Sequence, residues 1–203
     1  MTEALMDRRF KDLLEQLGAK TPTPGGGAVA SAAGALGAAL GSMVLAYSVG
    51  KKSLAAHDAR LKEAAARLHR AQSMLVQLAA EDEAAYGLVS ELQRLTDDDP
   101  RRADLPDATL AASHVPLSCM ATCMSVLGIL DELPGITNPH LRSDLAIAAV
   151  LAEAAARSAA WNVVANLPNL PDERTRQDLA EQCDSLLENA IATARRIERA
   201  CRA

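Results

Sequence analysis

The chain has 203 residues, a formal net charge of −5 and no cluster of basic residues, which argues against nucleic acid as a partner. Hydrophobic residues make up 49% of the sequence but aromatic residues only 2%, so alanine and leucine supply the apolar content. Both favour helices, whereas a β-sheet protein would use more aromatic and β-branched residues. The composition therefore predicts an all-α protein, with residues 1–203 forming a single domain.

The N-terminal residues carry several charges and do not resemble a secretory signal peptide. The four cysteines form no C-x-x-C pair, and no histidine has the spacing to complete a metal site. We therefore expect the thiols to be small core residues of a cytoplasmic protein that binds no metal. Residues 25–50 are rich in glycine, alanine and serine, which favours a helix buried among helices over a membrane span, so no membrane partner is expected.

The spacing of apolar residues predicts a compact bundle of about six helices. The first covers residues 3–17 and ends near Gly18. The second is a central helix of small residues over 27–49, with Gly50 as its C-terminal stop. The third, over residues 53–95, is unusually long, and its apolar positions recur every three or four residues.

The fourth helical region covers residues 105–133, with a bend or interruption expected at Pro116. Asn138 and Pro139 provide a cap and a first-turn proline for the fifth helix, which runs to residue 167. Asp172 caps a final helix that continues to the C-terminus. The many alanines predict close contacts between these helices, some of them between subunits.

The segment before the second helix contains Pro24 and three successive glycines, Gly25, Gly26 and Gly27. Proline holds the chain extended, whereas glycines permit a sharp turn and leave backbone N–H groups uncovered. Because a helix begins directly afterwards, these N–H groups lie at its positive end, where carboxylates and phosphates bind. The segment indicates either an anion-binding site or a tight turn before a closely packed helix.

Asp82 falls on the apolar side of the third helix, in line with Leu75, Ala79 and Tyr86. A carboxylate that faces the interior is destabilising unless it is paired, hydrogen-bonded or protonated. Burial also raises the pKa of such a group toward the range that suits a general acid or base. Asp82 is therefore either a catalytic carboxylate or one half of an ion pair between helices.

Polar residues follow one face of the fifth helix, with Asp144 near its start and Asn162 and Asn166 near its end. Amides on a buried face need hydrogen-bond partners, which a ligand, the backbone or water supplies. Lys51 and Lys52 follow the second helix, where they complement the helix dipole or attract an anionic ligand. Each of these residues is a candidate for substrate binding or for a purely structural contact.

Several motifs follow one another along nearly the whole chain: Phe10-x-x-Leu13, Leu17-Gly18-Ala19, Pro22-Thr23-Pro24-Gly25-Gly26-Gly27, Gly34-Ala35-Leu36-Gly37-Ala38-Ala39-Leu40, Met43-Val44, Val49-Gly50-Lys51-Lys52, Asp82-Glu83-Ala84-Ala85-Tyr86, Val115-Pro116-Leu117, Ser143-Asp144, Asn162-Val163 and Asn166. In this order they resemble the formiminotetrahydrofolate cyclodeaminase and methenyltetrahydrofolate cyclohydrolase family. The glycine motif combined with the later Ser-Asp…Asn-Val pattern is the most specific part of the resemblance.

The resemblance implies an all-α homodimer that acts on one-carbon derivatives of tetrahydrofolate without a metal or another cofactor. Asp82 matches the family's acid–base aspartate. The residues that the resemblance places near substrate are Pro24, Gly25, Gly26, Gly27, Lys51, Lys52, Ser143, Asp144, Asn162 and Asn166. The amides and Asp144 would orient the base or the pterin, and the glycine loop or the lysines would hold the anionic glutamate tail.

Two segments depart from the family pattern, because Ala46-Tyr47-Ser48 replaces Asn-Leu-Thr and Leu95-Thr96-Asp97 replaces Leu-Pro-Lys. Three hypotheses remain open. The chain is a methenyltetrahydrofolate cyclohydrolase that forms 10-formyltetrahydrofolate, a formiminotetrahydrofolate cyclodeaminase that releases ammonia, or a non-catalytic folate-binding dimer. We favour the first, because the cyclodeaminase is often fused to a formiminotransferase domain for which 203 residues leave no room.

Overall fold

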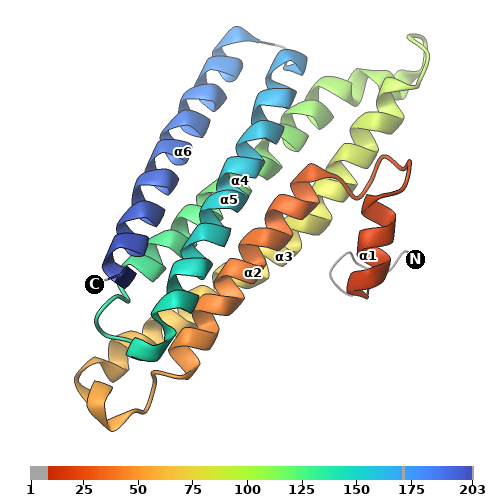
Figure 1. The fold of residues 1–203 in the computed structure, drawn as a ribbon. Helices are drawn as coiled ribbons and strands as arrows, with labels where there is room; N and C mark the ends of the chain where they lie inside the picture. Colours follow the sequence, from red (N-terminus) through yellow and green to blue (C-terminus); the bar gives the residue numbers. More distant parts are fainter. Residues whose placement is uncertain (1–8, 171, 203) are drawn as a thin grey trace.

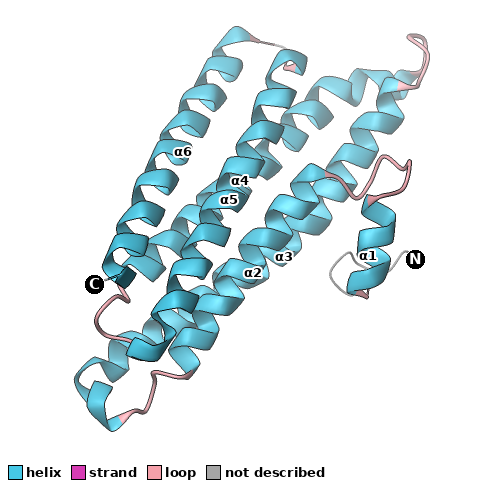
Figure 2. Cartoon of the chain, viewed as in Figure 1, coloured by secondary structure: helices cyan, strands magenta, loops and turns pink. Residues whose placement is uncertain are grey.

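The computed structural model describes residues 9–170 and 172–202, and all regular structure among them is helical (Figures 1 and 2). This confirms the predicted all-α class. The α-helices are α1 (Phe10–Leu17), α2 (Gly26–Ala46), α3 (Asp58–Gln93), α4 (Leu105–Asp131), α5 (Arg142–Asn166) and α6 (Glu173–Arg202). Short 3-10 helices join them: η2 (Lys52–His57), η3 (Pro100–Asp104), η4 (Pro139–Leu141) and η5 (Leu167–Asn169). Residues 3–8 of the predicted first helix lie outside the described residues.

Helices α2 to α5 form an antiparallel bundle in which α2 packs against α3 and α5, and α4 packs against the same two helices. Helix α6 lies along α4 and α5 and continues the up-and-down order, while α1 lies beside the N-terminal half of α2 (Figure 1). Because neighbours run in opposite directions, the start of α2 lies at the same end of the bundle as the end of α5. This end contains the candidate site.

The small residues of α2 allow it to approach its neighbours closely. A methyl group on Gly37 would lie 2.9 Å from the carbonyl oxygen of Ala148 and 3.1 Å from the backbone nitrogen of Ala152, both on α5. Alanines dominate the facing side of α5, where Ala148, Ala152 and Ala155 are completely buried. The backbones of α2 and α5 are therefore nearly in contact, as the composition of α2 predicted.

The second and third predicted helices differ from the structure at the loop between them. Helix α2 ends at Ala46, before the predicted residue 49, and Gly50 adopts a positive φ of 76°. Buried Ser48 donates its hydroxyl to the carbonyl of Val44 at 2.7 Å and accepts the backbone N–H of Asn138 at 2.9 Å. These bonds connect the end of α2 to the loop before η4. The predicted start of the third helix is the separate 3-10 turn η2.

Of the bend or interruption expected at Pro116, the interruption is absent, because α4 continues through this residue as one helix. Proline has no N–H, so the carbonyl of Ala112, four residues earlier, lacks its helical donor. The side chain of Asn166 on α5 supplies the donor instead, with Nδ2 at 3.4 Å from that carbonyl oxygen. A side chain from a neighbouring helix thus replaces the missing backbone bond.

Three stretches, Gly26–Ala46, Pro100–Asp131 and Pro139–Asn169, are long and apolar enough to cross a membrane by length and composition. In the bundle, 50 to 56% of their most apolar parts is buried by other helices. The prediction of no membrane partner is not tested by this packing. Cys119, Cys123 and Cys183 are free and buried in the same core, as predicted, and Cys201 is partly exposed.

Candidate active site

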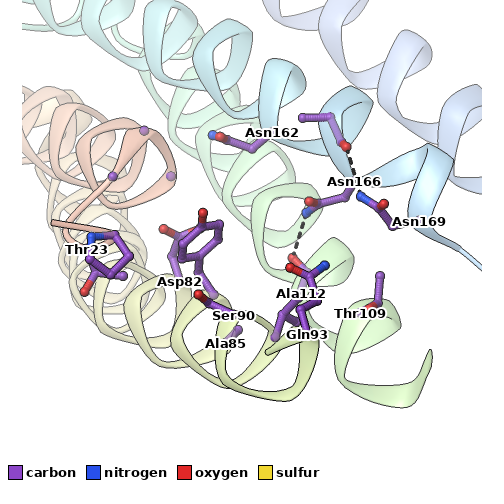
Figure 3. Close-up of a pocket in the computed structure, with 17 residues that line it drawn as sticks. Thr23, Asp82, Ala85, Ser90, Gln93, Thr109, Ala112, Asn162, Asn166 and Asn169 are labelled. Atoms are coloured by element: carbon purple, nitrogen blue, oxygen red, sulfur yellow. Dashed lines mark hydrogen bonds between the residues drawn. The ribbon is translucent and has the colours of Figure 1, made fainter. Parts of the chain in front are cut away.

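A cavity of about 470 Å³ lies where the start of α2, the second half of α3, the first turns of α4 and the end of α5 meet (Figure 3). Four elements that are distant in sequence therefore contribute to one pocket. Its lining residues are Pro22, Thr23, Gly25, Gly26, Gly27, Asp82, Ala85, Tyr86, Val89, Ser90, Gln93, Thr109, Ala112, Asn162, Ala165, Asn166 and Asn169.

Asp82 enters this cavity from α3 and lies directly against the first turn of α2. A methyl group on Gly27 would overlap the carboxylate of Asp82, so only glycine fits at position 27 with the aspartate in this place. The backbone N–H of Ala28 donates a hydrogen bond to the same carboxylate. Asp82 therefore binds the positive end of α2, where a negative charge is favoured by the helix dipole.

Partial burial raises the pKa of Asp82 above its ordinary value, and the negative charge of Glu83 adds a smaller increase. The hydrogen bond from Ala28 opposes both effects by stabilising the ionised form. A carboxylate with these surroundings is poised to accept and return a proton. No ion pair of Asp82 occurs among the described residues, so the alternative of an interhelical salt bridge is not supported.

The anion site that the glycine segment predicted is thus occupied, at least at Ala28, by a carboxylate of the protein itself. Gly26 faces the opposite wall, since a methyl group there would lie 3.3 Å from Oδ1 of Asn162 on α5. The two glycines therefore allow α2 to begin between Asp82 and Asn162 without filling the space between them.

Three asparagines follow one another along the end of α5 and η5. Asn162, Asn166 and Asn169 donate through Nδ2 to the carbonyls of Ser158, Ala112 and Ala165, at 3.5, 3.4 and 3.5 Å. Among the residues that the structure describes, none donates a hydrogen bond to the Oδ1 atoms of these asparagines. Figure 3 shows the three side chains above Asp82 along one wall of the pocket.

Asp82 is the only charged residue among those that line the pocket. Its other polar groups are neutral amides and hydroxyls. The site therefore suits a ligand whose reacting part is neutral or positively charged. Residues 9–170 and 172–202 place no cation in its lining for an anionic tail.

The remaining predicted site residues lie elsewhere in the single chain. Lys51 and Lys52 follow the far end of α2, about 30 Å from its start at 1.5 Å per residue. Ser143 and Asp144 lie in the first turn of α5, at that same far end. Pro24 is buried and borders a separate apolar groove between α1 and α2, although its neighbours Thr23 and Gly25 line the pocket.

Gln93, Thr109 and Asn169 line the pocket but were not predicted from the sequence. Gln93 and Asn169 are exposed, and Thr109 is buried near the start of α4 with its hydroxyl 2.8 Å from the carbonyl of Leu105. The repeat of asparagine at 162, 166 and 169 is the one sequence signal that could have identified Asn169. Gln93 and Thr109 have no such signal.

The segments that depart from the family pattern lie outside the pocket lining. Ala46, Tyr47 and Ser48 end α2 at the far end of the bundle. Asp97 lies in the loop between α3 and α4, with its side chain 98% exposed and 3.3 Å from Arg102. Within the described residues, no group of three or more histidine, cysteine, aspartate or glutamate side chains could hold a metal ion.

The chain is similar to known proteins over nearly its full length. It is 33% identical over 193 residues to a methenyltetrahydrofolate cyclohydrolase of Methylorubrum extorquens, which covers 93% of both chains. It is 30% identical over 197 residues to the formimidoyltransferase-cyclodeaminase of Sus scrofa, covering 95% of this chain and 36% of that protein. The chain therefore spans about a third of that longer relative.

The fold is also similar to a solved structure. A crystal structure of formiminotetrahydrofolate cyclodeaminase from Thermotoga maritima superposes with a TM-score of 0.90 at 25% identity, covering 98% of each chain. A model of the family described as formiminotransferase-cyclodeaminase matches residues 9–185. The chain belongs to the formiminotransferase-cyclodeaminase family.

Proposed function

We propose that this protein is a methenyltetrahydrofolate cyclohydrolase, which hydrolyses 5,10-methenyltetrahydrofolate to 10-formyltetrahydrofolate. The observation that carries the proposal is Asp82, the one charged group of a cavity otherwise lined by neutral residues. The methenyl bridge of the substrate is a cationic amidine, so a lone carboxylate attracts it. The full-length similarity to a methenyltetrahydrofolate cyclohydrolase supports the same assignment.

The chemistry requires one water molecule and one group that transfers a proton. The water oxygen bonds to the methenyl carbon while Asp82 accepts a proton from the water. This step gives a neutral tetrahedral intermediate. The bond from this carbon to N5 then breaks, and Asp82 returns the proton to N5. The hydroxyl of the intermediate loses its proton to solvent and becomes the formyl oxygen on N10. A positioned acid–base group of this kind contributes roughly 100- to 10,000-fold to rate.

The first turn of α2 has two effects on this carboxylate. The Ala28 N–H donates a hydrogen bond to it, and the absence of a side chain at Gly27 leaves room for it in this place. Asn162 on the opposite wall provides an amide oxygen to which no described residue donates, and this oxygen is suited to hold the attacking water. Helices α2, α3 and α5 would then hold both the base and the water in place. Such orientation of reactants makes a large contribution to catalysis.

The cyclodeaminase reaction is the second candidate, because several relatives are named for it. Asp82 would protonate the amine that leaves when 5-formiminotetrahydrofolate closes to the methenyl form. Two parallel assays separate the candidates: loss of methenyltetrahydrofolate absorbance beyond spontaneous hydrolysis, and ammonia release from 5-formiminotetrahydrofolate. The first signal alone supports the cyclohydrolase, the second the cyclodeaminase. Folate binding without either signal supports the non-catalytic dimer.

We also propose that the protein is a cytoplasmic homodimer that uses the outer side of α2 and α5, the α2/α5 face. Its exposed apolar residues are Val29, Leu36, Tyr47, Ile147, Val150 and Trp161, of which Trp161 is 73% exposed. A monomer rarely leaves so many large apolar side chains in water along two adjacent helices. A twofold axis that lies in this face and runs perpendicular to α2 would place the two α2 helices antiparallel, and so bring the lysine end of one chain toward the pocket end of the other.

A further inference from the structure

The pocket extends along α3 well beyond Asp82. Gln93 lies eleven residues after Asp82 on the same helix, which corresponds to roughly 16 Å along the axis. Gln93, Thr109, Asn166 and Asn169 enclose this distal part, which we call the amide end. Figure 3 shows Asp82 between Thr23 on one side and the amide end on the other.

The hydrogen-bonding capacity of the amide end is defined by its bonds to the protein. The only O–H of Thr109 points to the carbonyl of Leu105, so its oxygen can act only as an acceptor toward a ligand. Asn166 and Asn169 each use one N–H of Nδ2 on a backbone carbonyl and keep the second N–H as a donor and Oδ1 as an acceptor. The carboxamide of Gln93 has no protein partner among the described residues and offers both a donor and an acceptor.

A folate whose reacting carbon lies at Asp82 extends in two directions from that carbon. One direction carries the aminopyrimidinone ring, with an N3–H and a 2-amino group as donors beside the O4 acceptor. The other carries the benzoyl ring and the glutamate carboxylates, which only accept hydrogen bonds and are negatively charged. The ring half therefore needs mainly acceptors in its binding site, whereas the tail half needs donors or cations.

We propose that the amide end binds the aminopyrimidinone ring, so that the glutamate tail leaves the pocket on the Thr23 side of Asp82; this assignment rests on the proposed function. The ring donors match the acceptor oxygens of Thr109, Asn166 and Asn169, and the Gln93 amide pairs with an N–H and the carbonyl of the ring. A glutamate tail at the amide end would place its carboxylates beside three acceptor oxygens, with neutral N–H groups of the amides as the only donors and no cation among the described lining residues. A charged ligand group without a matching partner weakens binding, so the acceptor oxygens and the lack of a cation favour the orientation with the ring at the amide end.

The test uses two fragments of the substrate as separate probes, 6-methyltetrahydropterin and p-aminobenzoylglutamate. Calorimetry measures the Kd of each for the wild type, Gln93→Met and Asn169→Leu, and steady-state kinetics give kcat and KM with methenyltetrahydrofolate. Both residues are exposed, so these size-matched changes leave the core intact. Gln77→Met on α3 and Asn189→Leu on α6 are exposed controls outside the pocket.

We expect each pocket variant to weaken 6-methyltetrahydropterin binding and to raise KM by roughly 3- to 10-fold, with kcat within about twofold. Binding of p-aminobenzoylglutamate should not change, and neither control should alter any value. Weaker p-aminobenzoylglutamate binding with unchanged pterin binding would show the reverse orientation. Unchanged binding of both fragments by an active enzyme would overturn the assignment alone, whereas a wild type that binds neither fragment and hydrolyses no substrate would overturn the proposed function with it.

Discussion

The carboxylate of Asp82 occupies the space that a methyl group on Gly27 would need. The side chain of one helix therefore lies on the backbone of another, and the contact exists only because position 27 has no side chain. The Ala28 N–H completes the contact with a hydrogen bond. This relationship makes the glycine a determinant of where the proposed catalytic group lies.

Gly27→Ala should therefore reduce activity without a change in any ionisable group. We expect kcat/KM to fall by at least about 100-fold, because the displaced carboxylate loses its alignment. Overpacking should also lower the free energy of unfolding by about 1–3 kcal/mol, measured by urea denaturation. Gly128→Ala is the matched control, since nothing lies within 4 Å of a methyl group there. That variant should keep full activity and gain roughly 0.5–1 kcal/mol, as expected for an exposed helix position. A Gly27→Ala enzyme with wild-type activity would refute the positioning role.

The raised pKa of Asp82 predicts how kcat/KM depends on pH on the acidic side of its profile. A general base acts only when ionised, so kcat/KM should increase with pH through a pKa above the ordinary aspartate value. Glu83→Gln removes a negative charge that raises this pKa, so the increase should move to lower pH with the plateau retained. The control is Glu81→Gln on the exposed side of α3, which should leave the profile in place. A Glu83→Gln profile shifted to higher pH would have the wrong sign for this account.

The same shift predicts how stability depends on pH. Because the folded-state pKa of Asp82 is raised, folding favours the protonated carboxyl. Its contribution to stability is therefore complete below the unfolded-state pKa and is lost as pH increases through the folded-state value. Asp82→Asn has no carboxyl to ionise and so does not lose this stability. The free energy of unfolding of the variant, relative to that of the wild type, should therefore increase from acid to neutral pH. Denaturation at several pH values checks the trend, and a difference that decreases with pH would contradict it.

The bond from Asn166 to the carbonyl of Ala112 predicts a coupling with Pro116. Asn166→Leu leaves that carbonyl without a donor, which should cost about 1–3 kcal/mol of unfolding free energy. Pro116→Ala restores a backbone N–H in α4, so Asn166→Leu should cost less in that background. A double-mutant cycle by urea denaturation should give a coupling of about 1 kcal/mol. Asn189→Leu, whose amide also donates to a helix carbonyl, should show no coupling with Pro116→Ala.

The proposed dimer predicts an effect of charge on the α2/α5 face. Leu36→Asp, at a side chain 59% exposed on α2, should convert the protein to a monomer in analytical ultracentrifugation. Met74→Asp, at a side chain 48% exposed on α3, is the control and should leave the oligomeric state unchanged. A monomeric wild type at micromolar concentration would exclude this use of the face. If the Leu36→Asp monomer also loses activity, the partner chain completes the site.

The helical architecture followed from the sequence because alanine and leucine spacing determines helices directly. Pro116 is the instructive exception: of the bend or interruption expected there, the interruption is absent. Asn166, 50 positions later in the sequence, supplies the donor that the proline lacks. Such compensation arises from tertiary contacts and has no local signal. The spacing of apolar residues likewise did not predict the 3-10 turn η2, which precedes α3.

The site was predictable where its chemistry conflicted with the helix pattern. Asp82 stood on an apolar stripe, and Asn162 and Asn166 stood on a buried face, so each departed from the residue type expected there. Gln93 and Thr109 occupy positions where polar residues are ordinary, and only the fold shows that they face the cavity. Lys51, Lys52 and Ser143 lie at the other end of helices about 30 to 40 Å long, so one chain alone cannot place them beside Asp82.

The most direct test is the decay of methenyltetrahydrofolate absorbance with purified wild type and Asp82→Asn, corrected for spontaneous hydrolysis. We expect rapid decay with the wild type and a loss of roughly 100- to 10,000-fold in kcat for a folded Asp82→Asn protein. Circular dichroism and urea denaturation establish that the variant is folded. Wild-type decay no faster than the spontaneous rate, or full activity of Asp82→Asn, would contradict the account.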